Sequence, residues 1–555
     1  MSPASPTAVP LRSPDTVMCL ERLGAMHPTR LSFSRAMLRR VEAEGWRVSR
    51  PVWNIDPDGY GRAVYRVDTP QRRYSLVAFS QALAPEQRTD RVIATAWDAT
   101  FALFDGVPDA GDLDRLAGEV PRQEAGRFGE TELILSRANR SVRLFGAVMA
   151  ALAAGRQPEA ATLDAVGYLM RTTAVYGNGK FGIADRDLLA ERPEFAGPFR
   201  AEMLTVWLIR AFTVDLVDHC AAVRSPATAV RLAPELRRRL GVGNSTGLGM
   251  APFLVRHPLL LNAWMVARET ALARVRSLPT VARPAWVAFG AALADAREDA
   301  AGWTTQDAEQ ARRIEALRRD LDRLASRAEA GPPESWNALF RWVEDHCGLE
   351  AQEVAVGLLI EPHGALVDAL ADTMSADEGR GAAIQGGMSA GVLRELLARH
   401  YGWALGTDYA HAAAQARFWY VSAEKLEPRL GERADEPGHE LEQPLAIARD
   451  AARLDAVLAR VPPDMAVAAL LLEHPEHRHV VRRVQAAEHA PYAEVRGNLV
   501  DAAMRPIDLL RCKLAFFGAA RFDPRSDRWL RISLFAGAPF PDEIAAGRQP
   551  ATAAA

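Results

Sequence analysis

The sequence has few cysteines and no cysteine motif. Only four occur in 555 residues, and more than a hundred positions separate each from the next: Cys19, Cys220, Cys347 and Cys512. This spacing argues against a disulfide framework and against a cysteine zinc site, and no metal site is predicted. The pattern is typical of a reducing compartment, so we expect a cytoplasmic protein.

A surplus of positive charge is also missing. Lys and Arg number 67 against 70 Asp and Glu, which leaves a formal net charge of −3. Nucleic-acid-binding proteins usually carry a basic surplus or stripe, so nucleic acid is not the expected partner. No apolar run reaches the roughly 18 residues of a membrane-spanning helix, and none is predicted.

Secretory and catalytic signatures are absent as well. The Pro- and Ser-rich start lacks the apolar core of a signal peptide, and we expect disordered tails at 1–27 and 546–555. The sequence contains no H-E-x-x-H and no EF-hand loop. The reaction type and any cofactor are therefore unknown at this stage.

The composition, with 49% hydrophobic and 25% charged residues, is typical of a globular protein. Its sequence patterns predict an α+β part followed by a helical part. Residues 28–115 predict a small α+β module, because a helical pattern at 28–48 precedes alternating runs. Those runs predict antiparallel strands at 61–67, 73–79 and 91–106.

From residue 130 onward, apolar residues recur at helical spacing in Ala-, Leu- and Arg-rich segments. We predict a helical body over 130–430, an acidic break at 431–443, and C-terminal helices with a late strand over 444–545. The fold class predicted is mainly α with a small α+β N-terminal module, a multi-helix body and a short antiparallel sheet of three to five strands.

A glycine-rich stretch, Gly241–Gly249, is the first candidate site. It lacks the spacing of a dinucleotide fingerprint and the lysine of a phosphate-binding P-loop. Consecutive glycines can still aim backbone N–H groups at one anion, with side-chain support. The predicted anion-binding residues are Gly243, Asn244, Ser245, Thr246 and Gly247. The alternative is a tight helix–helix connection with a polar cap.

A second glycine-rich stretch, RTTAVYGNGKFGIADR, places Lys180 directly after a Gly-Asn-Gly turn. A lysine that is partly removed from water has a lowered pKa, which suits a general base, while a charged one anchors an anion. We predict Lys180 as a catalytic residue and Asn178 as a substrate contact. The alternative is an exposed lysine on a turn.

The next helix, at about 198–223, is apolar nearly all round and is expected to be buried. Asp215 and His219 lie four residues apart on one of its faces, where a carboxylate could orient an imidazole for proton transfer. A structural ion network is the alternative. Further along, Arg417 and Tyr420 stand among aromatic residues and are predicted additional anion contacts.

Together these features favour an enzyme that acts on a small anionic organic substrate bearing a carboxylate or a phosphate. The alternative is a non-catalytic helical scaffold whose glycine stretches are helix-packing elbows. The predicted partner is a small anionic molecule, with no membrane partner. The sequence leaves the oligomeric state open, and a homo-oligomer is one alternative.

Replacement of Lys180 by Ala tests the catalytic hypothesis. We expect turnover to be abolished while folding is retained, because a loop lysine contributes little to a packed core. Activity and circular dichroism measured on the same preparation check both halves. Normal turnover in this variant would remove Lys180 from the active site.

Overall fold

The computed structural model describes residues 9–81, 97–121, 130–172, 189, 191–246, 258–374, 383–408, 419–421, 428–430, 447–495, 506–519, 521–526 and 529–547. The chain divides into two compact units, each assembled from separate segments. Unit 1 comprises Met1–Leu31, Thr246–Phe516 and Asp523–Leu530, and unit 2 comprises Ser32–Ser245, Phe517–Phe522 and Arg531–Ala555.

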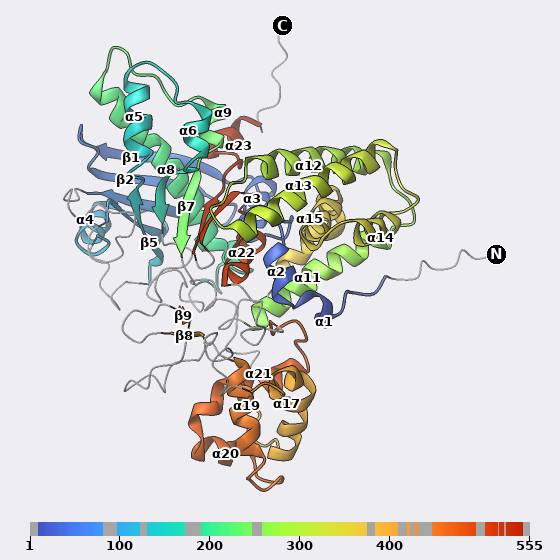
Figure 1. The fold of residues 1–555 in the computed structure, drawn as a ribbon. Coiled ribbons are helices and arrows are strands. Elements are labelled where there is room, and N and C mark those ends of the chain that lie inside the picture. The colour runs from blue at the N-terminus through green and yellow to red at the C-terminus, as the bar shows by residue number, and fades with distance from the viewer. Residues whose placement is uncertain are drawn as a thin grey trace. The chain divides into compact units, whose positions relative to one another are not determined.

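Unit 2 is organised on a long sheet (Figure 1). Its nine strands follow the order β1-β2-β3-β4-β5-β6-β7-β11-β10. The bounds are β1 Arg47–Ile55, β2 Gly61–Asp68, β3 Arg73–Ser80, β4 Ala99–Asp105, β5 Glu132–Arg140, β6 Tyr168–Thr172, β7 Gly241–Thr246, β10 Arg521–Ser526 and β11 Trp529–Leu534. β1 to β6 pair antiparallel in succession, whereas β6 and β7 are parallel.

The predicted fold class was therefore wrong about the sheet, which is mixed, curled and longer than three to five strands. Strands were predicted where β2, β3 and β4 lie, but β5 and β6 fall in segments that we expected to be helical. Both are buried on nearly every residue, so they lack the polar alternation that marks a half-exposed strand. The late strand expected within 521–540 is represented by β11, which joins this same sheet.

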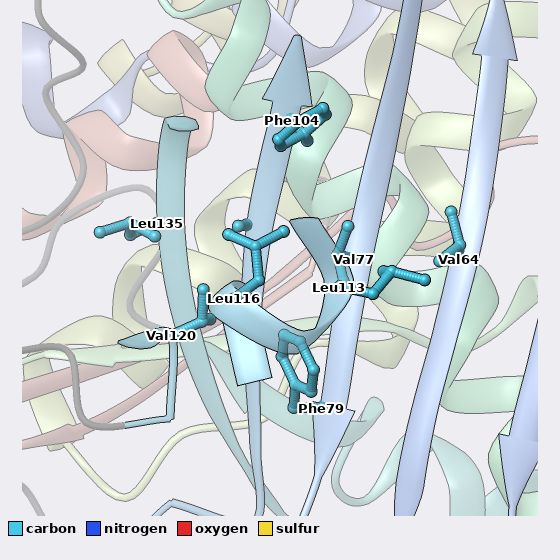
Figure 2. Packing of buried hydrophobic residues seen from close by; sticks show 9 residues of the cluster. Val64, Val77, Phe79, Phe104, Leu113, Leu116, Val120 and Leu135 are labelled. Carbon is cyan, nitrogen blue, oxygen red and sulfur yellow. The ribbon is translucent and has the colours of Figure 1, made fainter. Parts of the chain in front are cut away.

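One face of the sheet is covered in part by helix α4, Ala110–Glu119. A capping box begins this helix, because Asp109 and Asp112 each accept the other's backbone N–H. Figure 2 shows side chains of α4 and of the strands meeting in one hydrophobic cluster. The cluster comprises Val64, Val77, Phe79, Ala102, Phe104, Leu113, Leu116, Val120 and Leu135.

Helix α8, Arg200–Arg224, packs on the opposite face and corresponds to the apolar helix predicted at 198–223. Its Phe212 ring contacts the rings of Trp53, Tyr65 and Phe101 from three strands, at centroid distances of 6.1, 6.5 and 5.4 Å. The other helices of unit 2 are α3 Phe33–Ala43, α5 Phe145–Ala153, α6 Ala160–Asp164, the 3₁₀ turn η2 Pro193–Phe195, α9 Pro234–Arg238 and α23 Pro541–Gly547.

The outermost strand, β1, is irregular. Its pairing with β2 shifts register between Ser49 and Val52, and Pro51 lies inside the shifted stretch. Proline has no backbone N–H to donate, so it is tolerated at an edge or a bulge and not in the middle of a sheet.

The described residues of unit 1 are mainly helical and include a two-stranded ribbon. Its longer helices are α11 Pro258–Arg276, α12 Arg283–Gly302, α13 Ala308–Glu329, α14 Trp336–His346, α15 Leu349–Ile360, α17 Ala390–Leu405, α19 Ile447–Leu458, α21 Arg478–Ala487 and α22 Pro506–Phe517. Shorter elements are α1 Pro14–Val17, α2 Leu20–Ala25, η3 Glu361–His363, α16 Gly364–Val367, η4 Asp368–Thr373, α20 Val467–Glu473 and η6 Pro475–His477. The ribbon pairs β8, Trp419–Val421, with β9, Pro428–Leu430.

A buried ion network ties the start of the chain into unit 1. Glu353 of α15 accepts hydrogen bonds from Arg12, Arg22 and Arg268, and Arg12 also binds Glu269 at 2.7 Å. Burial alone would raise the pKa of Glu353, but Arg12 and Arg268 together hold it below its usual range. A buried carboxylate requires such partners to remain charged.

One segment, Leu349–Thr373, is long and apolar enough to cross a membrane by length and composition. It is the only such segment in the part of the chain that the structure describes. Over an apolar stretch of 18 residues within it, 56% is buried, and the segment carries the Glu353 network within its first helix. These properties are those of a core helix of unit 1.

Arg210 of α8 holds the strand ends of unit 2 together. It is buried and donates to the carbonyl oxygens of Leu240, Arg238 and Ala538 at 2.6, 3.3 and 2.8 Å. Its guanidinium also lies 3.8 Å from the centroid of the Phe540 ring. Residues 238–240 lead into β7, so one side chain joins α8 to the entry of that strand.

We expect Arg210→Met to lower the free energy of unfolding by about 3 kcal/mol, because three carbonyl groups lose their charged donor in a buried place. Thermal and denaturant unfolding measure the effect. Arg224→Met is the matched control, since it changes an exposed arginine at the end of the same helix. We expect the control to stay within about 0.5 kcal/mol of the unaltered chain. Equal stability of the two variants would contradict the stabilising role of the Arg210 hydrogen bonds.

Candidate functional site

Several predicted site residues lie outside the described residues. These are Lys180, Asn178, Gly247 and Arg417. Tyr420 lies in strand β8, opposite Arg429 of β9, and the structure describes its backbone alone. The catalytic role of Lys180 and the substrate contacts of Asn178, Gly247 and Arg417 therefore remain predictions.

The other predicted anion contacts, Gly243, Asn244, Ser245 and Thr246, lie in strand β7 and not in a loop. Here glycine is explained by close packing within the sheet. A Cβ on Gly243 would come within 2.6 Å of the Tyr168 ring, and one on Gly241 within 2.3 Å of the Leu534 carbonyl oxygen. Because neighbouring strands approach so closely, only glycine fits at these two positions.

Asp215 of α8 belongs to a polar cluster between helix and sheet. Its Oδ2 accepts a hydrogen bond from the Tyr65 hydroxyl at 2.5 Å and pairs with Arg50 at 2.7 Å. The Arg50 guanidinium in turn lies over the Trp53 ring, 4.4 Å from its centroid. Burial, and secondly the Asp215 charge, raise the pKa of Tyr65. The phenol therefore keeps its proton and donates it in the hydrogen bond to Asp215.

His219 uses both ring nitrogens in other contacts. Nδ1 accepts from the Trp53 indole N–H at 3.3 Å, and Nε2 lies 3.1 Å from the Asp56 carbonyl oxygen. These partners fit a neutral ring protonated on Nε2. The contacts of the described residues include no hydrogen bond between His219 and Asp215, so their acid–base role stays a prediction.

A cleft that sequence reasoning missed lies elsewhere in unit 2, at the end of strands β1 to β4. It has a volume of about 920 Å³. Its lining residues are Arg47, Arg66, Asp68, Thr69, Pro70, Gln71, Arg72, Arg73, Asp105, Gly106 and Val107. We call this feature the arginine cleft. Its lining includes four arginines and two aspartates.

Strand register explains how these arginines come together. Arg47 of β1 pairs with Asp68 of β2, and Asp68 pairs with Arg73 of β3. Residues paired across antiparallel strands share a face, as do residues two apart in one strand. Arg66 therefore joins this row on the same face as Val64, one step beyond the area that α4 covers. The face is apolar beneath α4 and basic where the helix is absent.

Ion pairs within the arginine cleft are few and loose. Asp68 lies 3.3 Å from Arg66 and 3.6 Å from Arg73, and Asp105 lies 3.8 Å from Arg72. The arginine side chains remain accessible, with exposed fractions of 37% for Arg66, 42% for Arg72 and 66% for Arg73. Their donors are therefore available to a ligand.

A buried wall fixes the turn between β2 and β3. Glu194, which is fully buried, accepts hydrogen bonds from the hydroxyls of Thr69 and Tyr74, both at 3.1 Å. Close by in the chain, Arg192 binds Asp105 with two nitrogens, at 3.0 and 2.5 Å. The arginine cleft thus has a rigid support on the side opposite to solvent.

Asp218, one helical turn after Asp215, gives α8 a pH-sensitive carboxylate. It accepts the backbone N–H of Leu232 at 3.0 Å. Burial raises its pKa to about 6, opposed by that hydrogen bond and assisted by the Asp215 charge. Between about pH 4 and pH 6, Asp218 therefore keeps its proton in the folded chain and loses it in the unfolded chain. This difference stabilises the fold at low pH, and the stabilisation is lost as the pH rises through about 6.

We expect Asp218→Asn to raise the free energy of unfolding by about 1 kcal/mol at pH 7.5, a value reduced for partial exposure, and by almost nothing at pH 4. Asparagine keeps the acceptor for Leu232 and removes the charge. Melting temperatures at both pH values measure the difference. Asp114→Asn, at an exposed carboxylate, is the control and should show no gain at either pH. A gain for Asp218→Asn that is equal at both pH values would contradict the buried-charge explanation.

Among the described residues, no three His, Cys, Asp or Glu side chains group as metal ligands. No protein-family model, no curated protein and no solved structure matches this chain. A function for this chain therefore has to be inferred from the geometry of its own residues.

Proposed function

We propose that this chain binds a small anionic organic molecule, bearing a carboxylate or a phosphate, in the arginine cleft of unit 2. The observation that carries the proposal is the gathering of four arginines against two aspartates around one cleft of about 920 Å³. A cleft of this size suits a small organic molecule, since ligand sites typically measure about 300–1,000 Å³.

The chemistry of the lining supports an oxyanion ligand. A guanidinium group is planar, always charged, and presents paired N–H donors that match a carboxylate or a phosphate. Thr69 and Gly106 also line the cleft, but the Thr69 hydroxyl donates to Glu194 and the Gly106 N–H donates to the Arg73 carbonyl oxygen, so the arginines carry the proposal. An uncharged or cationic ligand would leave the excess positive charge without compensation.

We also propose that the chain is a cytoplasmic enzyme that acts on such a molecule, with the reaction type left open. Asp68 and Asp105 are the carboxylates of the arginine cleft, and both are engaged by arginine side chains. Their arrangement favours recognition of the ligand. A reactive group would have to come from another part of the chain, such as the predicted Lys180.

The proposal is tested with the double variant Arg66→Gln/Arg73→Gln and a ligand panel of inorganic phosphate, glycerol phosphate, succinate, citrate and acetate. We expect at least one anion to stabilise the unaltered chain against heat. The double variant should raise the dissociation constant of that anion, measured by calorimetry, by about tenfold for each arginine that it lacks. The reason is that each substitution removes a charge-assisted hydrogen bond.

Arg62→Gln is the matched control. Arg62 lies in the same strand as Arg66 and on the same face, but it pairs with Asp114 at 3.1 Å outside the arginine cleft. We expect its dissociation constants to equal those of the unaltered chain. Binding that survives the double variant, or no stabilisation by any anion, would refute the proposed function.

A further inference from the structure

The charges of the arginine cleft do not balance. Arg47, Arg66, Arg72 and Arg73 supply four positive charges, whereas Asp68 and Asp105 supply two negative ones. The supporting wall adds Arg192 and Glu194, one charge of each sign. The excess therefore stays at two positive charges whether the wall is counted or not.

The excess is concentrated at two of the arginines. Asp68 is shared by Arg66 and Arg73. Asp105 lies 2.5 Å from Arg192 but 3.8 Å from Arg72, so its carboxylate compensates mainly the charge of Arg192. Within the described residues no carboxylate lies within 4 Å of the Arg47 guanidinium. Arg47 and Arg72 are thus the guanidinium groups with the least compensation.

We infer that the ligand of the arginine cleft carries two negative charges, as a phosphate monoester or a dicarboxylate does. This inference rests on the proposed function, since it names the class of anion that the same cleft prefers. A dianion neutralises the excess, while a monoanion leaves one positive charge without a partner. The preference is electrostatic, so it should weaken as salt is added.

Matched ligand pairs that differ by one charge test the inference at pH 7.5 and low salt. Methyl phosphate, a dianion at this pH, is compared with dimethyl phosphate, and succinate is compared with its monomethyl ester. We expect the dianion of at least one pair to bind about tenfold more tightly than its monoanion. The pair with the larger ratio identifies the ligand as a phosphate monoester or a dicarboxylate.

Variants at the two least compensated arginines assign the effect to the arginine cleft. In Arg47→Gln and in Arg72→Gln the dianion-to-monoanion ratio should fall about threefold or more, because one excess charge is gone. In Arg62→Gln the ratio should stay unchanged. A loss of affinity from misfolding alone would lower binding of both members of a pair equally and leave the ratio intact.

Each result bears on a separate statement. If monoanions and dianions bind equally, or if the ratio survives in both arginine variants, the inference of a dianionic ligand is overturned while the proposed function stands. If none of the four probes binds to the unaltered chain, the inference is overturned, and if no anion of the earlier panel binds either, the proposed function is overturned with it. Calorimetry with the full-length chain provides all of these measurements.

Discussion

The antiparallel register of β1, β2 and β3 is the constraint on which the candidate site depends. It aligns Arg47, Asp68 and Arg73 in one row, although these residues are separated in the sequence by ordinary strand and turn segments. Alternation then sends every second residue of the same strands toward α8, where the face is apolar and buried. A slip of one residue would turn the arginines into that core.

Coverage of the sheet is unequal on its two faces, and this inequality produces a polar cleft beside a hydrophobic core. Helix α8 runs for 25 residues across one face. Helix α4 has only 10 residues and covers the cluster around Val77 and Ala102 on the other. Where α4 does not reach, the same strands carry charged residues in place of valine and alanine. The length of α4 therefore sets the border between the hydrophobic cluster and the arginine cleft.

The sequence allowed the local part of this structure to be predicted. Strands β2 and β3 are rich in β-branched and aromatic residues and lie between turns, and α8 is apolar on nearly all sides, so both kinds of element were anticipated. The arginine cleft was missed because it depends on strand pairing, which no single segment encodes. The signal was present in Arg47, Arg66 and Arg73, but only the register shows that they are neighbours. The glycines of β7 allow two explanations, because close strand packing and anion binding select the same residue, and their role in anion binding stays a prediction.

The irregular edge at β1 has a consequence for the chain as a whole. A long sheet ends in rows of backbone groups that can recruit a strand from another molecule. At β1 the shifted register and the missing amide hydrogen of Pro51 break such a row in its middle, and Arg47 and Arg50, which both precede Pro51, add charge to this edge. A foreign strand would find no continuous template there, so β1 can carry exposed basic side chains and still be poorly suited to pairing with a strand of another molecule.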